Sequence, residues 1–294
     1  MRSRTAARLQ LIAAAVLFST GGAAIKAAAF TGWQIASFRS GVAALAILLV
    51  SRDARRGWNW RVVIVGAAYA ACLTLFVLAN RLTTAANTIY LQSTAPLYLL
   101  VLAPWLLREP VRRKDVGFMA VIALGLAFFF VGVDQPIASA PDPVRGNIVA
   151  LASGFFWALT VCGLRWMESG ERTRGSAVAA VAVGNLIAFA VSLPMALPVG
   201  AHEVSDWGLI VFLGVFQIAI AYLFVTAGLR SVPALEAALI LLIEPALNPL
   251  WAWVVQGERP GPWALAGGAL ILGATTIKAM WDAHASGLRE EVGA

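Results

Sequence analysis

Apolar residues occur along this chain in long blocks separated by short polar links. A membrane-spanning helix needs about 20 mostly apolar residues, and ten blocks have about that length. They cover residues 9–29, 33–51, 60–80, 85–107, 115–133, 145–167, 175–198, 207–229, 233–256 and 262–281. The longest link, near 134–144, is rich in Pro and Asp. The pattern predicts an all-α integral membrane protein with ten transmembrane helices and no soluble domain.

Composition and charge agree with a bilayer environment. The chain is 60% hydrophobic and 13% charged, whereas a typical globular domain carries about 25% charged residues. Its net charge of +7 comes from short links with no aromatic-interleaved basic patch, which argues against nucleic acid as a partner. Cys72 and Cys162 both lie in apolar blocks and offer neither a disulfide framework nor a metal-binding spacing. We therefore expect no metal and no cofactor.

The basic residues also predict the orientation. With ten spans both termini lie on one side, and 17 of the 22 Lys and Arg residues then fall on that side. Because basic links stay in the cytoplasm, we predict cytoplasmic N- and C-termini. The first block follows three arginines as a signal peptide would. It contains Lys26 and has a counterpart later in the chain, so we interpret it as a retained helix.

The two halves of the chain match each other. A shift of 149 residues aligns Arg81 with Arg230, Ala85 with Ala234, Pro96 with Pro245, and Glu109 with Glu258. A shift of 139 pairs Phe18 with Trp157 and Lys26 with Arg165. Five spans per half give the copies opposite orientations, as in many secondary transporters. We predict two inverted-topology repeats, residues 1–138 and 139–294, around a central cavity.

Prolines interrupt corresponding apolar blocks in the two halves. Pro96 lies in the fourth block, and Pro245 and Pro249 lie in the ninth. A proline removes a helical hydrogen bond, and a broken membrane helix is tolerated where it is buried in protein or lines a wet cavity. We expect these three prolines to mark helix breaks with a gating role.

Helical phase gives candidate cavity residues, because residues that share a face recur at about 100° per residue. The mixed polar and aromatic faces contain Tyr69, Phe76 and Asn80; Asn87, Tyr90, Thr94 and Tyr98; Ser153, Trp157 and Thr160; Gln217 and Phe224; and Glu244, Asn248 and Trp251. Tyr222 lies deep in its apolar block but not on the helical face of Gln217. Gln92 points away from the face that contains Tyr90. Such a lining suits an amphipathic aromatic solute. Helix packing is the alternative for each aromatic and each small polar residue.

Three charged residues, Lys26, Arg39 and Glu244, lie within the apolar blocks. Such charges are costly in a membrane and usually functional. Glu244 has three open interpretations: it binds a substrate ammonium, carries a coupling proton, or pairs with Arg39 or Lys26. Lys26 has the alternative of extending to the membrane surface, and Glu109 and Glu258 that of a solvated or helix-capping role.

The sequence resembles the EamA-type drug/metabolite transporter family. The resemblance rests on a mid-helix proline, then a short loop with Glu (LREPVRRKDVG and QGERPGPWALAGG), then a glycine-punctuated helix, and on the arginine of FRSGVAALAILL. The first half departs from the family pattern at Arg108. Within the family, the positions of Tyr69, Tyr90 and Trp157 are similar to those of aromatic amino-acid exporters. The resemblance implies outward transport of an aromatic amino acid or similar metabolite by alternating access across a bacterial inner membrane.

Other function classes are less compatible with the sequence. An intramembrane enzyme is disfavoured because His202 and His284 lie outside the predicted spans, and no GxSxG occurs. A primary pump is disfavoured because the sequence contains no GxxxxGK[ST], the phosphate-binding loop of ATP-driven pumps. A carrier of another metabolite or drug, a channel and a lipid scramblase remain alternatives. The expected partners are a small-molecule substrate and the lipid bilayer.

Overall fold

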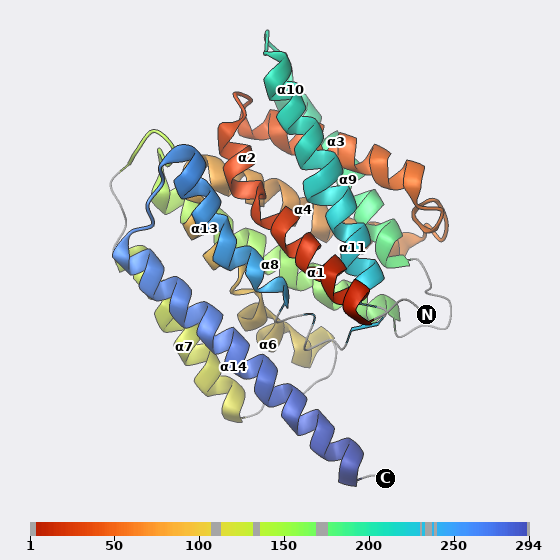
Figure 1. Cartoon of the computed structure of the whole chain (residues 1–294), viewed down its shortest axis with the longest axis vertical. Helices are drawn as coiled ribbons and strands as arrows, with labels where there is room; N and C mark the ends of the chain where they lie inside the picture. Colours follow the sequence, from red (N-terminus) through yellow and green to blue (C-terminus); the bar gives the residue numbers. More distant parts are fainter. Residues whose placement is uncertain are drawn as a thin grey trace.

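The computed structural model describes residues 4–106, 113–131, 136–168, 176–229, 231–232, 237 and 240–292, and the regular elements in these ranges are helical. In chain order they are α1 (Arg4–Ser19), α2 (Gly21–Ala27), α3 (Gly32–Val50), η1 (Asp53–Arg55), α4 (Trp60–Leu82), α5 (Ala85–Gln92), α6 (Ala95–Leu106), α7 (Arg113–Val131), α8 (Pro143–Glu168), α9 (Ser176–Ala196), α10 (Val204–Val211), η2 (Phe212–Ile220), α11 (Ala221–Gly228), α13 (Ile243–Gln256) and α14 (Pro262–Val292). Figure 1 shows them as one elongated bundle.

Six helices in the described part of the chain are long and apolar enough to cross a membrane. They are Thr5–Ala27, Gly32–Val50, Trp60–Leu82, Pro143–Leu164, Ala177–Ala196 and Val204–Gly228. The chain is thus a multi-pass membrane protein. The count of ten spans stays a prediction, and parts of the fourth, fifth, seventh and ninth blocks lie outside the described residues.

Several helices begin at a side chain that satisfies free backbone N–H groups. Thr31 and Gln34 form a reciprocal capping box before α3. The Asn59 Oδ1 accepts hydrogen bonds from the first turn of α4, and the Thr84 Oγ1 accepts one from the Asn87 N–H in α5. Such caps stabilise a helix end by about 1 kcal/mol each.

Three of the expected spans are interrupted near their middle. The first changes direction at Thr20 between α1 and α2, the fourth is broken at Ser93 and Thr94 between α5 and α6, and the ninth has a turn at Leu242 before α13. The eighth is continuous but contains η2, a nine-residue π-helical stretch between α10 and α11. Interruptions and π-helical turns of this kind often accompany functional sites.

Glycines allow the central helices to approach closely. Helix α4 lies against both α8 and α9, and α7 pairs with α14 along one side of the bundle (Figure 1). Where α4 crosses α9, Gly66 faces Gly184. A Cβ at Gly184 would lie 2.7 Å from the Gly66 carbonyl oxygen and 2.7 Å from a ring carbon of Tyr69. The contact therefore has no room for a side chain on α9.

We predict that Gly184→Ala lowers the unfolding temperature of the detergent-solubilised protein. Overpacking a tight contact costs about 1–3 kcal/mol, because here the obstructing atom belongs to backbone. The matched control is Gly208→Ala in α10, where an added Cβ meets nothing within 4 Å. There the alanine should leave the unfolding temperature unchanged or raise it. Equal effects at both positions, measured by fluorescence-detected thermal unfolding, would contradict the described crossing.

Candidate functional site

A partly open cavity of about 310 Å³ lies where the interrupted helices meet. Its wall is formed by Phe18, Arg39, Tyr69, Cys72, Leu73, Phe76, Ile89, Gln92, Ser93, Ala95, Pro96, Trp157, Gln217, Ile218, Tyr222, Val225, Leu241, Leu242, Glu244, Pro245 and Thr275. The volume is at the lower end of the range for small-molecule sites, about 300–1,000 Å³. The cavity therefore suits one molecule of amino-acid size.

Aromatic rings form a connected chain along the wall. Tyr222 meets Phe18 edge to face at 5.1 Å between ring centroids and Tyr69 at 5.4 Å. Trp157 continues the chain, 6.5 Å from Tyr69. These distances are typical of favourable ring pairs, so the four rings hold one another in place and present faces for an apolar or aromatic ligand group.

Polar groups of the same wall include two with unused hydrogen-bonding capacity. The Arg39 side chain, in a residue only 1% exposed, donates from Nη2 to the Leu73 carbonyl oxygen at 3.0 Å. Its Nε and the Gln217 Oε1 have no hydrogen-bond partner within the described residues. Glu244 lies in the first turn of α13 and adds an acidic group.

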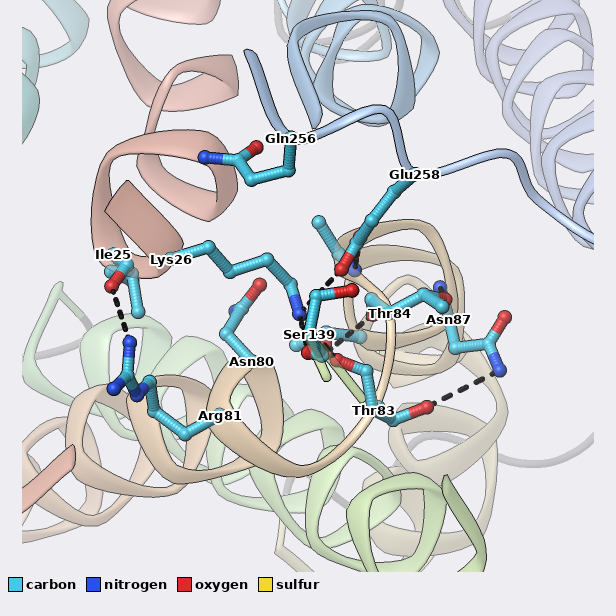
Figure 2. A network of polar contacts seen from close by, with 12 residues as sticks. Ile25, Lys26, Asn80, Arg81, Thr83, Thr84, Asn87, Ser139, Gln256 and Glu258 are labelled. Atoms are coloured by element: carbon cyan, nitrogen blue, oxygen red, sulfur yellow. Dashed lines mark hydrogen bonds and ion pairs between the residues drawn. The ribbon is translucent and has the colours of Figure 1, made fainter. Parts of the chain in front are cut away.

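A second polar cluster lies between one end of α2 and the loops that precede α5, α8 and α14 (Figure 2). The Lys26 Nζ is 2.7 Å from the Glu258 Oε1, and both side chains are 3% exposed. Lys26 also donates to the carbonyl oxygens of Thr83 and Ser139. The Glu258 Oε2 accepts from the Ala85 N–H at 3.0 Å, so it caps α5. We call these residues the Lys26–Glu258 cluster.

Neighbouring hydrogen bonds extend the Lys26–Glu258 cluster across the bundle end. The Gln256 side chain donates to the Ala23 carbonyl oxygen at 2.7 Å. Arg81 donates to the carbonyl oxygen of Ile25 (Figure 2) and to that of Ala28. The side chains of Asn87, Thr83 and Asn147 form hydrogen bonds with one another, and the Asn147 Nδ2 donates to the Phe129 carbonyl oxygen. The contacts join helices from both halves of the chain.

A left-handed glycine positions the acidic member of the cluster. Helix α13 ends at Gly257, whose φ of 71° is readily adopted only by glycine. The N–H of Glu258 then bonds back to the Ala252 carbonyl oxygen. The turn leaves the Glu258 carboxylate over the N-terminus of α5, where the helix dipole also favours a negative charge.

The structure brings nine of the residues predicted from sequence to the cavity wall. These are Arg39, Tyr69, Phe76, Pro96, Trp157, Gln217, Tyr222, Glu244 and Pro245. Pro96 and Pro245 follow the two breaks directly, with Pro245 three residues after Leu242. Glu244 pairs with neither Arg39 nor Lys26 in the described part of the chain, since Lys26 is bound to Glu258. The expectation that Lys26 extends to the surface is wrong, because its side chain is buried.

Other predicted residues lie away from the cavity. Asn80, Thr94 and Thr160 bond to carbonyl oxygens of their own helical turn, a common alternative for short polar side chains. The remaining ones are Asn87 in the network above, Tyr90 against Gly268, Tyr98 against Phe155, Ser153 beside Cys72, Asn248 against Gly22, Trp251 hydrogen-bonded to Ser19, and Phe224, which is not part of the cavity wall. The expectation that Pro249 marks a helix break is wrong, because Pro249 lies inside α13. Glu109 lies outside the described residues.

Gln92 shows why helical phase failed in the fourth block. The phase correctly puts Gln92 and Tyr90 on different faces, but the cavity is on the Gln92 side, and its Nε2 donates to the Ser153 Oγ at 2.8 Å. Thr94 and Tyr98 follow the break, so a single phase does not extend to them. Cys72, Ser93 and Thr275 were also missed. Phe18 had a usable indication in the sequence, since the repeat pairs it with Trp157.

Comparisons with known proteins agree with a transporter fold. The model of the EamA-like transporter family matches residues 6–131 and 144–279. The "Uncharacterized transporter YyaM" of Bacillus subtilis (strain 168) is 24% identical over 191 residues, which are 62% of this chain and 60% of that protein. A solved crystal structure shares the fold with a TM-score of 0.60 and 20% identity, over 95% of this chain and 98% of its own.

We predict that the Lys26–Glu258 pair is strongly coupled. Lys26→Met leaves a buried carboxylate without its cation and should cost about 3–5 kcal/mol in stability. The double variant Lys26→Met/Glu258→Gln removes both charges and should recover part of that loss. Thermal unfolding of the two single variants and the double variant gives the coupling free energy. Strictly additive losses would show that the two charges do not depend on each other.

Proposed function

The chain belongs to the EamA-like transporter family, and on this premise we propose that it is a secondary transporter of small amphipathic metabolites. We propose aromatic amino acids as the preferred cargo, moved by alternating access through the central cavity. The observation that carries the proposal is the aromatic-lined, partly open cavity at the meeting point of the interrupted helices. Its four-ring wall offers edges and faces to an aromatic side chain.

An inverted repeat of two five-helix halves is supported by the cavity wall itself. The shift of 149 residues that aligns the halves pairs wall residues with wall residues. The pairs are Tyr69 with Ile218, Leu73 with Tyr222, Phe76 with Val225, Gln92 with Leu241, Ser93 with Leu242, Ala95 with Glu244, and Pro96 with Pro245. The shift of 139 adds Phe18 and Trp157. A cavity lined by equivalent positions is expected on the symmetry axis between two repeats.

The helix contacts support the same symmetry. Exchanging the halves converts the contact of α4 with α8 into that of α11 with α1, and both contacts occur. The pairs α3 with α9 and α7 with α14 map onto themselves, and both are also present. The proposal places one repeat at residues 1–138 and the other at 139–294.

A carrier fits this arrangement better than an open channel or a lipid scramblase. The Lys26–Glu258 cluster joins both halves at the bundle end opposite the N-terminus of α1 and lies beyond the cavity. We propose that this cluster is the closed gate on one side. Breaking it while the other side closes would give alternating access, with bending at the breaks before Pro96 and Pro245. With the termini in the cytoplasm of a bacterial cell, the cavity is then reached from the cytoplasm.

Transport of radiolabelled phenylalanine into proteoliposomes tests the cargo. We expect saturable flux that other aromatic amino acids compete for. We also expect at least about a tenfold loss of apparent affinity in Trp157→Ala, because a partly buried aromatic contact in the cavity wall is removed. Trp253→Ala, an exposed residue of the same type outside the cavity wall, should transport normally. If only non-aromatic metabolites move or compete, the carrier remains and the aromatic preference is wrong.

Cys72 provides a native reporter of which side the cavity opens to. Its thiol lies in the cavity wall and Cys162 does not, so a Cys162→Ala background isolates it. We expect a small thiol reagent to label Cys72 faster in inside-out than in right-side-out vesicles, and phenylalanine to slow the labelling. Cys72→Ala measures the background. Equal labelling from both sides would favour a channel over a gated carrier.

A further inference from the structure

Arg39 is a buried cation that the protein does not neutralise. It has no ion-pair partner within the described ranges, one hydrogen bond to the Leu73 carbonyl oxygen, and an Nε without any partner there. A guanidinium has five N–H donors that match a carboxylate in a two-bond geometry. Its position in the cavity wall therefore leaves donors available to an anionic group of a ligand.

Glu244 supplies the opposite charge from a different helix. It lies in the first turn of α13, lines the same cavity, and forms no ion pair among the described residues. A carboxylate in an aromatic-rich wall is a good receptor for an ammonium, because the ring faces of Tyr222 and Phe18 add cation–π attraction. Arg39 and Glu244 are too far apart to satisfy each other within the 4.0 Å of a salt bridge, so each charge is left for a ligand.

The charge balance of the wall restricts what binds there. Arg39 and Glu244 are the only Lys, Arg, Asp or Glu residues among the described residues that form it. A ligand with one charge would satisfy one of them and leave the other buried and alone, which is strongly unfavourable. A ligand with both charges and no net charge satisfies both. A zwitterion is therefore the matching chemical class.

The two halves contribute unlike groups at equivalent positions, which gives such a ligand a single orientation. Glu244 is paired by the repeat with Ala95, and Tyr222 with Leu73. The cation comes from the first half and the anion from the second. A zwitterion bound between them cannot be turned around, even though the surrounding frame is symmetric.

We propose that Arg39 binds the carboxylate and Glu244 the ammonium of a zwitterionic α-amino acid, whose side chain lies against the aromatic wall. This assignment rests on the transport function proposed above. It makes both charges of the substrate obligatory, so the protein discriminates against amines and acids with the same side chain. Gln217, whose Oε1 is buried without a partner in the described chain, lines the same cavity.

Ligand-induced shifts of the unfolding temperature test the assignment. The ligands are phenylalanine, phenethylamine (no carboxylate), 3-phenylpropionate (no ammonium) and the non-aromatic zwitterion leucine. In the unchanged protein we expect the two singly charged compounds to bind at least about 30-fold more weakly than phenylalanine, the lower limit for an unpaired buried charge. Arg39→Gln should remove the penalty against phenethylamine and keep that against 3-phenylpropionate. Glu244→Gln should do the reverse.

The crossed pattern separates recognition from folding. If each variant weakens all ligands by the same factor, the two residues are structural and the assignment is wrong, while phenylalanine binding to the unchanged protein still supports the aromatic cargo. A different outcome is that leucine binds and phenylalanine does not, while the variants act selectively on leucine and its singly charged analogues. In that case the charge assignment stands and the aromatic preference fails. If no zwitterion binds, both fail. Arg39→Lys, which keeps the charge, should retain the penalty against phenethylamine and covers the case in which Arg39→Gln does not fold.

Discussion

The bilayer imposes one constraint on which this structure depends: polar groups released inside it must find their partners within the protein. Each helix break near the cavity frees backbone groups, and each buried charge needs a counter-charge or a hydrogen bond. The breaks at Ser93 and at Leu242 accordingly lie at the wall of the cavity. At the end of the bundle the same requirement is met by Lys26 and Glu258, which satisfy each other, the N-terminus of α5 and two loop carbonyl oxygens. A single buried pair thus holds together segments from the beginning, middle and end of the chain.

The two buried cations illustrate how neighbouring groups decide the role of a charge. Lys26 is an ammonium, a compact point charge with three donors, and the structure uses it for a carboxylate and two carbonyl oxygens. The Arg39 guanidinium is planar, and only some of its N–H donors have partners among the described residues. The first arrangement is complete and stabilises one end of the bundle, whereas the second is incomplete and gives the cavity its polarity. Both residues were equally conspicuous in the sequence, and only their surroundings separate them.

Sequence patterns predicted a helical membrane protein and the helix breaks before Pro96 and Pro245, because hydropathy and proline act locally along the chain. The break expected at Pro249 is absent, since Pro249 lies inside α13, and the interruption at Thr20 was not predicted. They predicted the cavity wall only in part. Tyr69, Trp157 and Glu244 were found because each lies on a continuous helical face, whereas Tyr98 was misassigned because its phase was carried across the break at Ser93 and Thr94. The partner of Lys26 was not predictable from spacing, since Glu258 reaches it only through the left-handed turn at Gly257. Long-range pairing of this kind depends on how loops fold over the bundle, which periodicity does not describe.

The unlike residues at repeat-related positions also bear on how such a protein diversifies. In the inverted repeat proposed above, the geometry of the wall belongs to both copies, while its chemistry at each position belongs to one copy. A substitution at Glu244 alters one pole of the cavity and leaves Ala95, its counterpart, in place. In the proposed transporter, cargo preference is therefore able to drift one functional group at a time, without disturbing the breaks at which we propose that the helices bend. On this proposal, duplication followed by unequal change supplies a route by which one scaffold acquires many solutes.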